Sequence, residues 1–204
     1  AFDSKIQAEF ETADIDISDD ELSDFGIFHW VLEFAEVWAD GRFDVVIGNP
    51  PWDVLNPSRD DFFSNYDELF RTRTPNEKDE KQQELLDDSI IENEWNQYRD
   101  EMERRADYFT KGDTYTLQDP DVEGQPVATQ NDLSQLFLER VFRLVSEDGY
   151  VSQIIPGQIF SGAPAKDIRM KMMNETSITA LIEFEKKGIF QGIHNQYQFV
   201  ISVV

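Results

Sequence analysis

The sequence predicts an α/β fold, and three observations support this class. Short apolar runs of strand length recur along the chain, at 43–48, 150–156, 177–185 and 196–204. Amphipathic stretches with helical spacing separate most of these runs, which is the alternation typical of α/β domains. About ten residues join the last two runs, too few for the crossover that parallel strands need. We therefore expect the last two strands to form an antiparallel pair.

The first predicted elements lead to a strand. Residues 1–25 are acidic, and we expect an irregular lead-in there. The stretch "IFHWVLEFAEVW", residues 27–38, predicts a helix whose apolar positions are core: Ile27, Trp30, Val31, Phe34, Val37 and Trp38. The run "FDVVIG", residues 43–48, is almost continuously apolar, which predicts a parallel strand covered on both faces.

A polar segment then interrupts the pattern. Residues 77–109 predict a helical stretch with a patchy apolar face, and the Gly, Pro and Asp content of 111–130 predicts a loop. After this segment, 132–145 predicts an amphipathic helix with Asn131 or Asp132 as its N-cap. The strand 150–156 follows, and Pro164 suits the first turn of a helix that runs to about Met173.

The charge of the chain is strongly negative. Acidic residues outnumber basic ones 42 to 18, which gives a net charge of −24, all of it carried by residues 1–138. This charge opposes binding to nucleic acid, unless the protein works in a high-salt cytoplasm where surface charge is screened. The low lysine content favours such a halophilic origin, while an ordinary acidic protein or a DNA mimic is the alternative. The absence of cysteine excludes disulfides and thiolate chemistry and fits a cytoplasmic location.

The most informative motif is "NPPW", directly after the strand 43–48. Ligands of open α/β sheets bind beyond the carboxyl ends of strands, which is where Asn49 lies. Asn49 offers an amide oxygen, and Pro51 holds Pro50 extended, so that the Pro50 carbonyl is a second rigid acceptor. Trp52 adds a flat aromatic face. The alternative interpretation is a rigid turn that merely closes the strand.

Two rigid acceptors beside an aromatic face suit a planar group with two N–H donors. The exocyclic amine of adenine or cytosine is such a group. Its lone pair is delocalised into the ring, and two hydrogen bonds accepted from its hydrogens favour a pyramidal, more nucleophilic nitrogen. Trp52 is then placed to stack on the base.

The stretch "FDVVIGNPPW" resembles the catalytic motif of adenine-N6 DNA methyltransferases. Within this family the chain looks like the large gamma-type methylase domains of restriction–modification and phage-defence enzymes. Three further stretches carry the resemblance: "FHWVLEFAEVW", "DLSQLFLERVFRLVSEDGYVSQIIP" and "FEKKGIFQGIHNQYQFVISVV". The resemblance implies the C-terminal part of a Rossmann-like, S-adenosylmethionine-dependent methyltransferase sheet. Residues 1–56 and 131–204 are then the partial catalytic domain, and 57–130 an acidic, partly helical insertion.

The resemblance also assigns roles to residues. It implies that Asn49 and Pro50, held by Pro51, bind the target amine, and that Trp52 and Phe190 stack on the two faces of a flipped adenine. Asn rather than Ser at the first motif position favours adenine over cytosine. Lys186, Lys187 and His194 are candidate contacts to phosphates of double-stranded DNA, against solvated charge for the lysines and a structural hydrogen bond for the histidine. No metal site is expected.

One part of the family pattern has no match in the chain. The family carries a glycine-rich cofactor loop upstream of the NPPW motif, and residues 1–43 contain none. Asn49 is then expected to line only part of the S-adenosylmethionine pocket, in a chain that is one part of a longer enzyme with a separate recognition domain. Two other hypotheses stay open: a methylase-like module that binds nucleic acid without turnover, and an acidic interaction protein or DNA mimic.

Overall fold

The computed structural model describes residues 3–12, 14–16, 18, 20, 28, 30–118, 120–126, 131–184 and 199–203. The chain divides into two compact units, which are treated separately. The first consists of Ala1–Val54 and Tyr108–Val204, and the second of Leu55–Asp107. Within the described ranges, no helix is long and apolar enough to cross a membrane.

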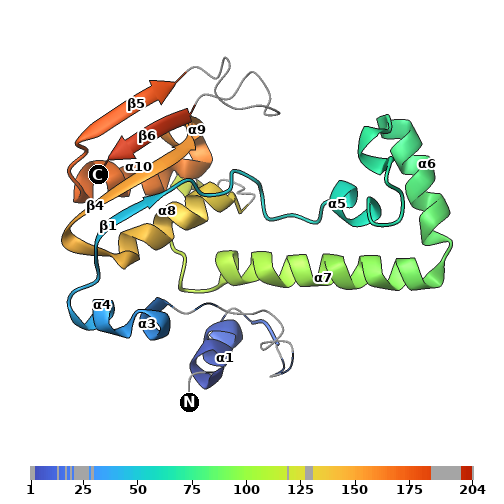
Figure 1. Ribbon diagram of the computed structural model, residues 1–204, viewed down its shortest axis with the longest axis horizontal. Helices are drawn as coiled ribbons and strands as arrows, with labels where there is room; N and C mark the ends of the chain where they lie inside the picture. The colour runs from blue at the N-terminus through green and yellow to red at the C-terminus, as the bar shows by residue number, and fades with distance from the viewer. Residues whose placement is uncertain are drawn as a thin grey trace. The chain divides into compact units, whose positions relative to one another are not determined.

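The first unit is built on a four-stranded sheet (Figure 1). Its strands lie in the order β1 (Phe43–Gly48), β4 (Val145–Pro156), β6 (Phe199–Val203) and β5 (Ala180–Phe184). β1 and β4 are parallel, whereas β6 is antiparallel to both of its neighbours. The α/β class and the antiparallel pairing of the last two strands are therefore confirmed.

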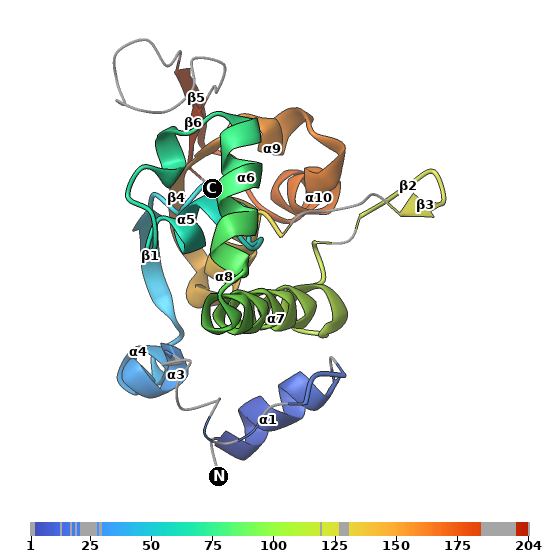
Figure 2. The same ribbon diagram turned by 90° about the vertical axis from the view of Figure 1, so that its right-hand side faces the viewer.

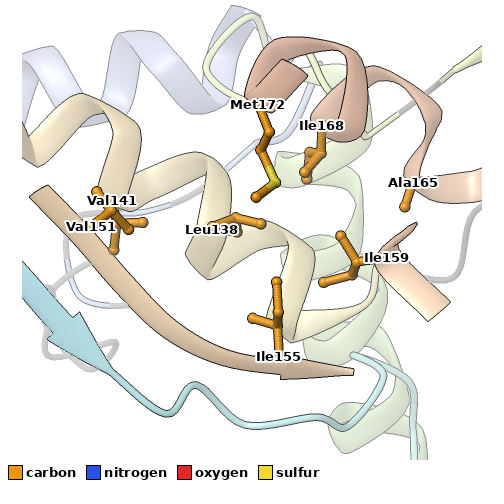
Figure 3. Close-up of a cluster of buried hydrophobic side chains, with 8 residues drawn as sticks. All are labelled: Leu138, Val141, Val151, Ile155, Ile159, Ala165, Ile168 and Met172. Carbon is orange, nitrogen blue, oxygen red and sulfur yellow. The ribbon is translucent and has the colours of Figure 1, made fainter. Parts of the chain in front are cut away.

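One face of this sheet carries the hydrophobic core (Figure 3). Helix α8 (Leu133–Leu144) packs on β4, into which it leads directly, and α9 (Gln158–Ser161), the short 3₁₀ helix η2 (Ala163–Ala165) and α10 (Lys166–Glu175) complete the layer. The helix predicted from Pro164 thus begins as a 3₁₀ turn. Eight buried residues form the core cluster: Leu138, Val141, Val151, Ile155, Ile159, Ala165, Ile168 and Met172.

The opposite face of β1 is open. Val45 is 51% exposed and Ile47 is 78% exposed, so the expectation that β1 is covered on both faces is wrong for the described part of the chain. The reason is the two-residue alternation of a strand. The register pairs Val46 with Val151 of the core cluster, which turns Val45 and Ile47 to the face away from that cluster.

The aromatic stretch before β1 forms two short helices instead of one long helix. α3 (Trp30–Glu33) and α4 (Ala35–Ala39) are separated by a turn at Phe34. The rings of Trp30 and Phe34 stack with centroids 5.7 Å apart, and both contact Phe43 at the start of β1. The predicted aromatic packing exists, but neither helix contains a buried residue and Phe34 is exposed, so the expected core role is wrong for these residues. Ile27 lies outside the described residues.

Residues 3–12 of the N-terminal lead-in are helical rather than irregular, and most of 13–25 lies outside the described residues. Helix α1 (Asp3–Thr12) places Phe10 against Tyr108, with ring centroids 4.7 Å apart. Phe10 is buried, and this tertiary contact is absent from any local signal in the acidic sequence. The predicted loop 111–130 also contains a small hairpin, β2 (Asp121–Val122) and β3 (Gln125–Pro126), which Figure 2 shows apart from the main sheet.

The second unit is helical and has its own core. Its elements are α5 (Arg59–Phe63), the 3₁₀ helix η1 (Phe70–Thr72), α6 (Pro75–Leu86) and the first part of α7 (Ser89–Lys111). The single helical stretch predicted for 77–109 is interrupted at residues 87–88, which are not helical and separate α6 from α7. Phe63 and Phe70 are fully buried and pack ring to ring, and Trp95 packs on Phe63.

Candidate active site

The NPPW motif lies where the sequence places it, at the carboxyl end of β1. β1 ends at Gly48, and the four motif residues continue as irregular backbone. Asn49 is exposed, Pro50 is buried and Pro51 is exposed. The side chain of Asn49 has no hydrogen bond to any described residue, so its amide is available to a ligand. The buried Pro50 fixes the backbone on which that amide stands.

Trp52 is anchored to the neighbouring strand. Its indole Nε1–H donates to the backbone carbonyl of Ile154 on β4, at 3.3 Å. Ile154 lies one residue beyond Gln153, the partner of the last β1 residue, Gly48. The indole therefore occupies the space at the end of β1, beside the continuing strand β4, and its half-buried ring is held there rather than free in solvent.

The chain that leaves the motif is held by the start of helix α8. The carbonyl of Asp53 accepts a hydrogen bond from Leu133 N at 2.9 Å, and Val54 forms a β-bridge with Asp132. Asp132 is the N-cap of α8, because its carboxylate accepts from the backbone N–H of Ser134 at 2.8 Å. Of the two N-caps left open by the sequence, Asp132 is thus the one used. The motif is fixed on both sides, by β1 before it and α8 after it.

A residue that sequence reasoning missed lies beside the motif. Gln153 of β4 is only 3% exposed, although it is polar and sits in an apolar strand. Its carboxamide lies against Gly48, where a Cβ atom would stand 3.0 Å from both Nε2 and Oε1. The one signal in the sequence is an amide inside the otherwise apolar run "YVSQIIP". Only the strand register connects that amide to the NPPW motif.

The remaining predicted site residues lie outside the described part of the chain. Phe190, Lys186, Lys187 and His194 all fall between β5 and β6, within 185–198. Their proposed contacts with the base and with phosphates are untested. Among the described residues, no group of His, Cys, Asp and Glu is arranged to hold a metal ion.

The electrostatics of the first unit include one buried carboxylate away from the motif. Glu139 of α8 is 2% exposed. Its oxygens accept from the backbone N–H of Thr116 and Leu117 and from the side chain of Gln118, at 2.8, 3.2 and 2.8 Å. Arg143 completes the set with an ion pair at 2.8 Å. This carboxylate fixes the loop before α8 and is fully engaged, so it is a structural group rather than a free base.

The mixed sheet with its helices is compatible with an α/β methyltransferase, and comparison with known families shows the family. A family model described as Eco57I restriction-modification methylase matches residues 2–83 and 108–190. This match spans well over half of the chain, and the chain belongs to that family. Membership implies methyl transfer with DNA as the substrate. No curated protein and no solved structure matches the chain significantly.

Proposed function

We propose that this chain carries the catalytic motif of an adenine-specific DNA methyltransferase, which transfers a methyl group from S-adenosylmethionine to the exocyclic N6 amine of adenine. The observation that carries the proposal is the free amide of Asn49, exposed at the carboxyl end of β1 next to an anchored Trp52. Family membership supports methyl transfer to DNA in general. The choice of amine rests on the motif.

The proposed role of the motif follows from its acceptors. Asn49 Oδ1 and the Pro50 carbonyl each accept a hydrogen bond from the N6 amine. Both bonds withdraw the amine hydrogens from the ring plane, which favours a nitrogen whose lone pair is localised. Pro51 restricts Pro50 to an extended backbone, so the two acceptors need little reorganisation when the base arrives.

Base capture is the proposed role of Trp52. An adenine inside a duplex has to leave the base stack, at a cost of a few kcal/mol. Stacking on an aromatic side chain returns about 1–3 kcal/mol per base. The hydrogen bond to Ile154 holds the Trp52 ring in place before the base arrives. Phe190 is proposed for the second face, and Lys186, Lys187 and His194 for contacts to phosphates, as the sequence resemblance implies.

The cofactor needs more residues than the NPPW motif supplies. Methylases of this family generally use S-adenosylmethionine. Asn49 lines at most part of such a pocket, and the sequence upstream of it holds no glycine-rich loop. The residues present therefore do not form the whole cofactor site. We propose that another segment of the same polypeptide supplies the loop, and a further one the DNA-recognition domain. The open apolar face of β1, with Val45 and Ile47, supports such an additional layer.

The test is product identification with the full-length enzyme. The enzyme is incubated with double-stranded DNA and S-adenosylmethionine at high salt, and the DNA is digested to nucleosides for mass spectrometry. N6-methyladenine supports the proposal, and methylated cytosine overturns the choice of base. DNA binding without any methylated product favours the module without turnover. Loss of a basic partner as salt rises favours the acidic interaction protein.

Residues 1–204 alone are proposed to be inactive and to bind S-adenosylmethionine poorly. Calorimetry at high salt measures this directly. Tight binding at one site per chain contradicts the proposal that much of the cofactor pocket lies elsewhere.

A further inference from the structure

We propose that Gln153 is a positioning residue for Asn49 and acts through Gly48. This inference rests on the proposed function, because it assigns a role within the same motif. Gln153 is neither part of NPPW nor next to it in the sequence. The strand register brings it there, since Gln153 is the direct partner of Gly48 in the parallel pair of β1 and β4.

The carboxamide of Gln153 lies close to Gly48 through both its nitrogen and its oxygen. A Cβ atom at position 48 would stand 3.0 Å from Nε2, 3.0 Å from Oε1 and 3.4 Å from the carboxamide carbon of Gln153. Near-equal distances to both heteroatoms, with the carboxamide carbon farther away, mean that the carboxamide points its nitrogen–oxygen edge at the position of this Cβ atom. Gln153 is buried, so its side chain has little room to move away. Only glycine fits at position 48 while the carboxamide keeps its place.

The consequence for Asn49 follows from its position. Gly48 is the last residue of β1, and Asn49 follows it directly in the chain. At the other end of the motif, the indole N–H of Trp52 donates a hydrogen bond to the carbonyl of Ile154, the residue after Gln153 in β4. Two successive residues of β4 thus fix the two ends of the motif. A shift of Gly48 away from the Gln153 carboxamide is passed directly to the amide that holds the target amine.

The first arm of the test crowds the contact. Gly48→Ala in the full-length enzyme places a methyl group against the carboxamide, and the neighbour has to give by a few tenths of an ångström. A misplacement of about 1 Å costs about 10²-fold in rate, so we expect kcat to fall about tenfold while DNA affinity is kept. Gln153→Ala in the same background makes room for the methyl group. We expect its kcat to return to that of Gln153→Ala alone.

The control separates positioning from stability. Gly149 is more tightly crowded than Gly48, since a Cβ there would lie 2.6 Å from Val145 Cγ2 and 2.8 Å from the Asp44 carbonyl. This contact involves the start of β1 rather than the end that carries Asn49. Gly149→Ala is expected to lower the melting temperature and to leave the kcat of the folded enzyme unchanged.

If Gly48→Ala does not fold, two variants of Gln153 replace it. Gln153→Ala should lower kcat, and Gln153→Met, whose side chain has a similar length, should preserve it.

The outcomes are distinguishable. A Gly48→Ala enzyme with the parent kcat, or a double variant whose loss is the product of the two single losses, overturns the inference. If the Gln153→Ala and Gln153→Met variants are used instead, a Gln153→Ala enzyme with the parent kcat also overturns the inference. If the parent methylates adenine and Asn49→Ala abolishes this while Gly48 and Gln153 variants behave as the parent, only this inference fails. If Asn49→Ala retains activity, the proposed function itself fails.

Discussion

The indole N–H of Trp52 and the backbone carbonyl of Ile154 lie 3.3 Å apart in a hydrogen bond that joins the NPPW motif to β4. Ile154 is the first β4 residue beyond the register with β1, so the bond is made where the strand pairing stops. The aromatic ring of the motif is therefore held by the central part of the sheet. The anchor through Nε1 is therefore separable from the stacking on the base that is proposed for the ring of Trp52.

Substitutions at Trp52 separate these roles. Trp52→Phe keeps a flat ring but removes the N–H donor, so it loses the anchor and leaves the Ile154 carbonyl without that donor. Because a neutral hydrogen bond contributes about 0.5–1.5 kcal/mol, we expect a stability loss of that size and a modest fall in base capture. Trp52→Ala should lose both roles and weaken base capture further.

Base capture is followed with 2-aminopurine at the target position in the full-length enzyme. Extrusion should raise its fluorescence, and stacking on position 52 should partly quench the rise. If the Phe and Ala variants give the same signal as the parent, Trp52 does not contact the flipped base.

Glu139 is the residue on which the stability of the first unit depends most clearly. Glu139→Ala leaves two backbone N–H groups and the Gln118 amide without their acceptor, while Arg143, which is 37% exposed, stays hydrated. Leaving a buried hydrogen-bond donor unsatisfied costs about 1–3 kcal/mol, and we expect a loss of at least this size. Urea denaturation at constant KCl measures it. Glu147→Ala, an exposed glutamate at the start of β4, is the control and should change stability by less than about 0.5 kcal/mol. Equal effects of the two substitutions would contradict the structural role of Glu139.

The second unit should lose stability in acid through Asp67. The hydrogen bond from Arg73, at 2.6 Å, lowers the pKa of the Asp67 carboxyl, whose side chain is 12% exposed. Because the folded-state pKa lies below the unfolded value of about 3.9, the stabilisation is fully present above that pH. It is lost as the pH falls through the lower folded value. Hydrogen bonds from Thr74 lower the pKa of Glu77 in the same way, so Glu77 contributes to the same loss of stability in acid.

Matched variants isolate the Asp67 contribution. Asp67→Asn and Arg73→Gln each remove the pair, so both should flatten the decline of the melting temperature between about pH 5 and pH 3. The double variant should match the single ones in slope. A parent-like slope in Arg73→Gln would show that this ion pair does not set the pH dependence.

The net charge of −24 predicts that stability depends on salt. Self-repulsion opposes the compact state when screening is weak, and the Debye length falls from about 10 Å at 0.1 M to about 3 Å at 1 M salt. The melting temperature should therefore rise substantially between these KCl concentrations. A melting temperature that stays constant would count against an origin in high salt.

The elements that local pattern predicts well are those whose signal lies within a few residues. The strand 43–48 has the bounds of β1, and the amphipathic pattern of 132–145 corresponds closely to α8. The break between α6 and α7 was missed, because helical composition continues through 87–88. Helix α1 depends on the contact of Phe10 with Tyr108, which is far away in the sequence.

The candidate site was predictable in part for the same reason. Asn49 to Trp52 are contiguous, and their rigid geometry follows from proline chemistry alone. The bond from Trp52 to Ile154 and the contact of Gln153 with Gly48 depend on a strand register between segments about a hundred residues apart. No local pattern encodes that register, so these two contacts needed the structure.

The central claim is that the Asn49 amide holds the target amine, and the single-turnover rate of methyl transfer by full-length Asn49→Ala tests it most directly. Removing one preorganised hydrogen-bonding group at a reacting centre costs about 10²–10³ in rate, and we expect at least this loss with DNA affinity little changed. Asn76→Ala, an exposed asparagine in α6, is the matched control and should keep the parent rate. An Asn49→Ala rate within about threefold of the parent, equivalent to about 0.7 kcal/mol of barrier, would contradict the account.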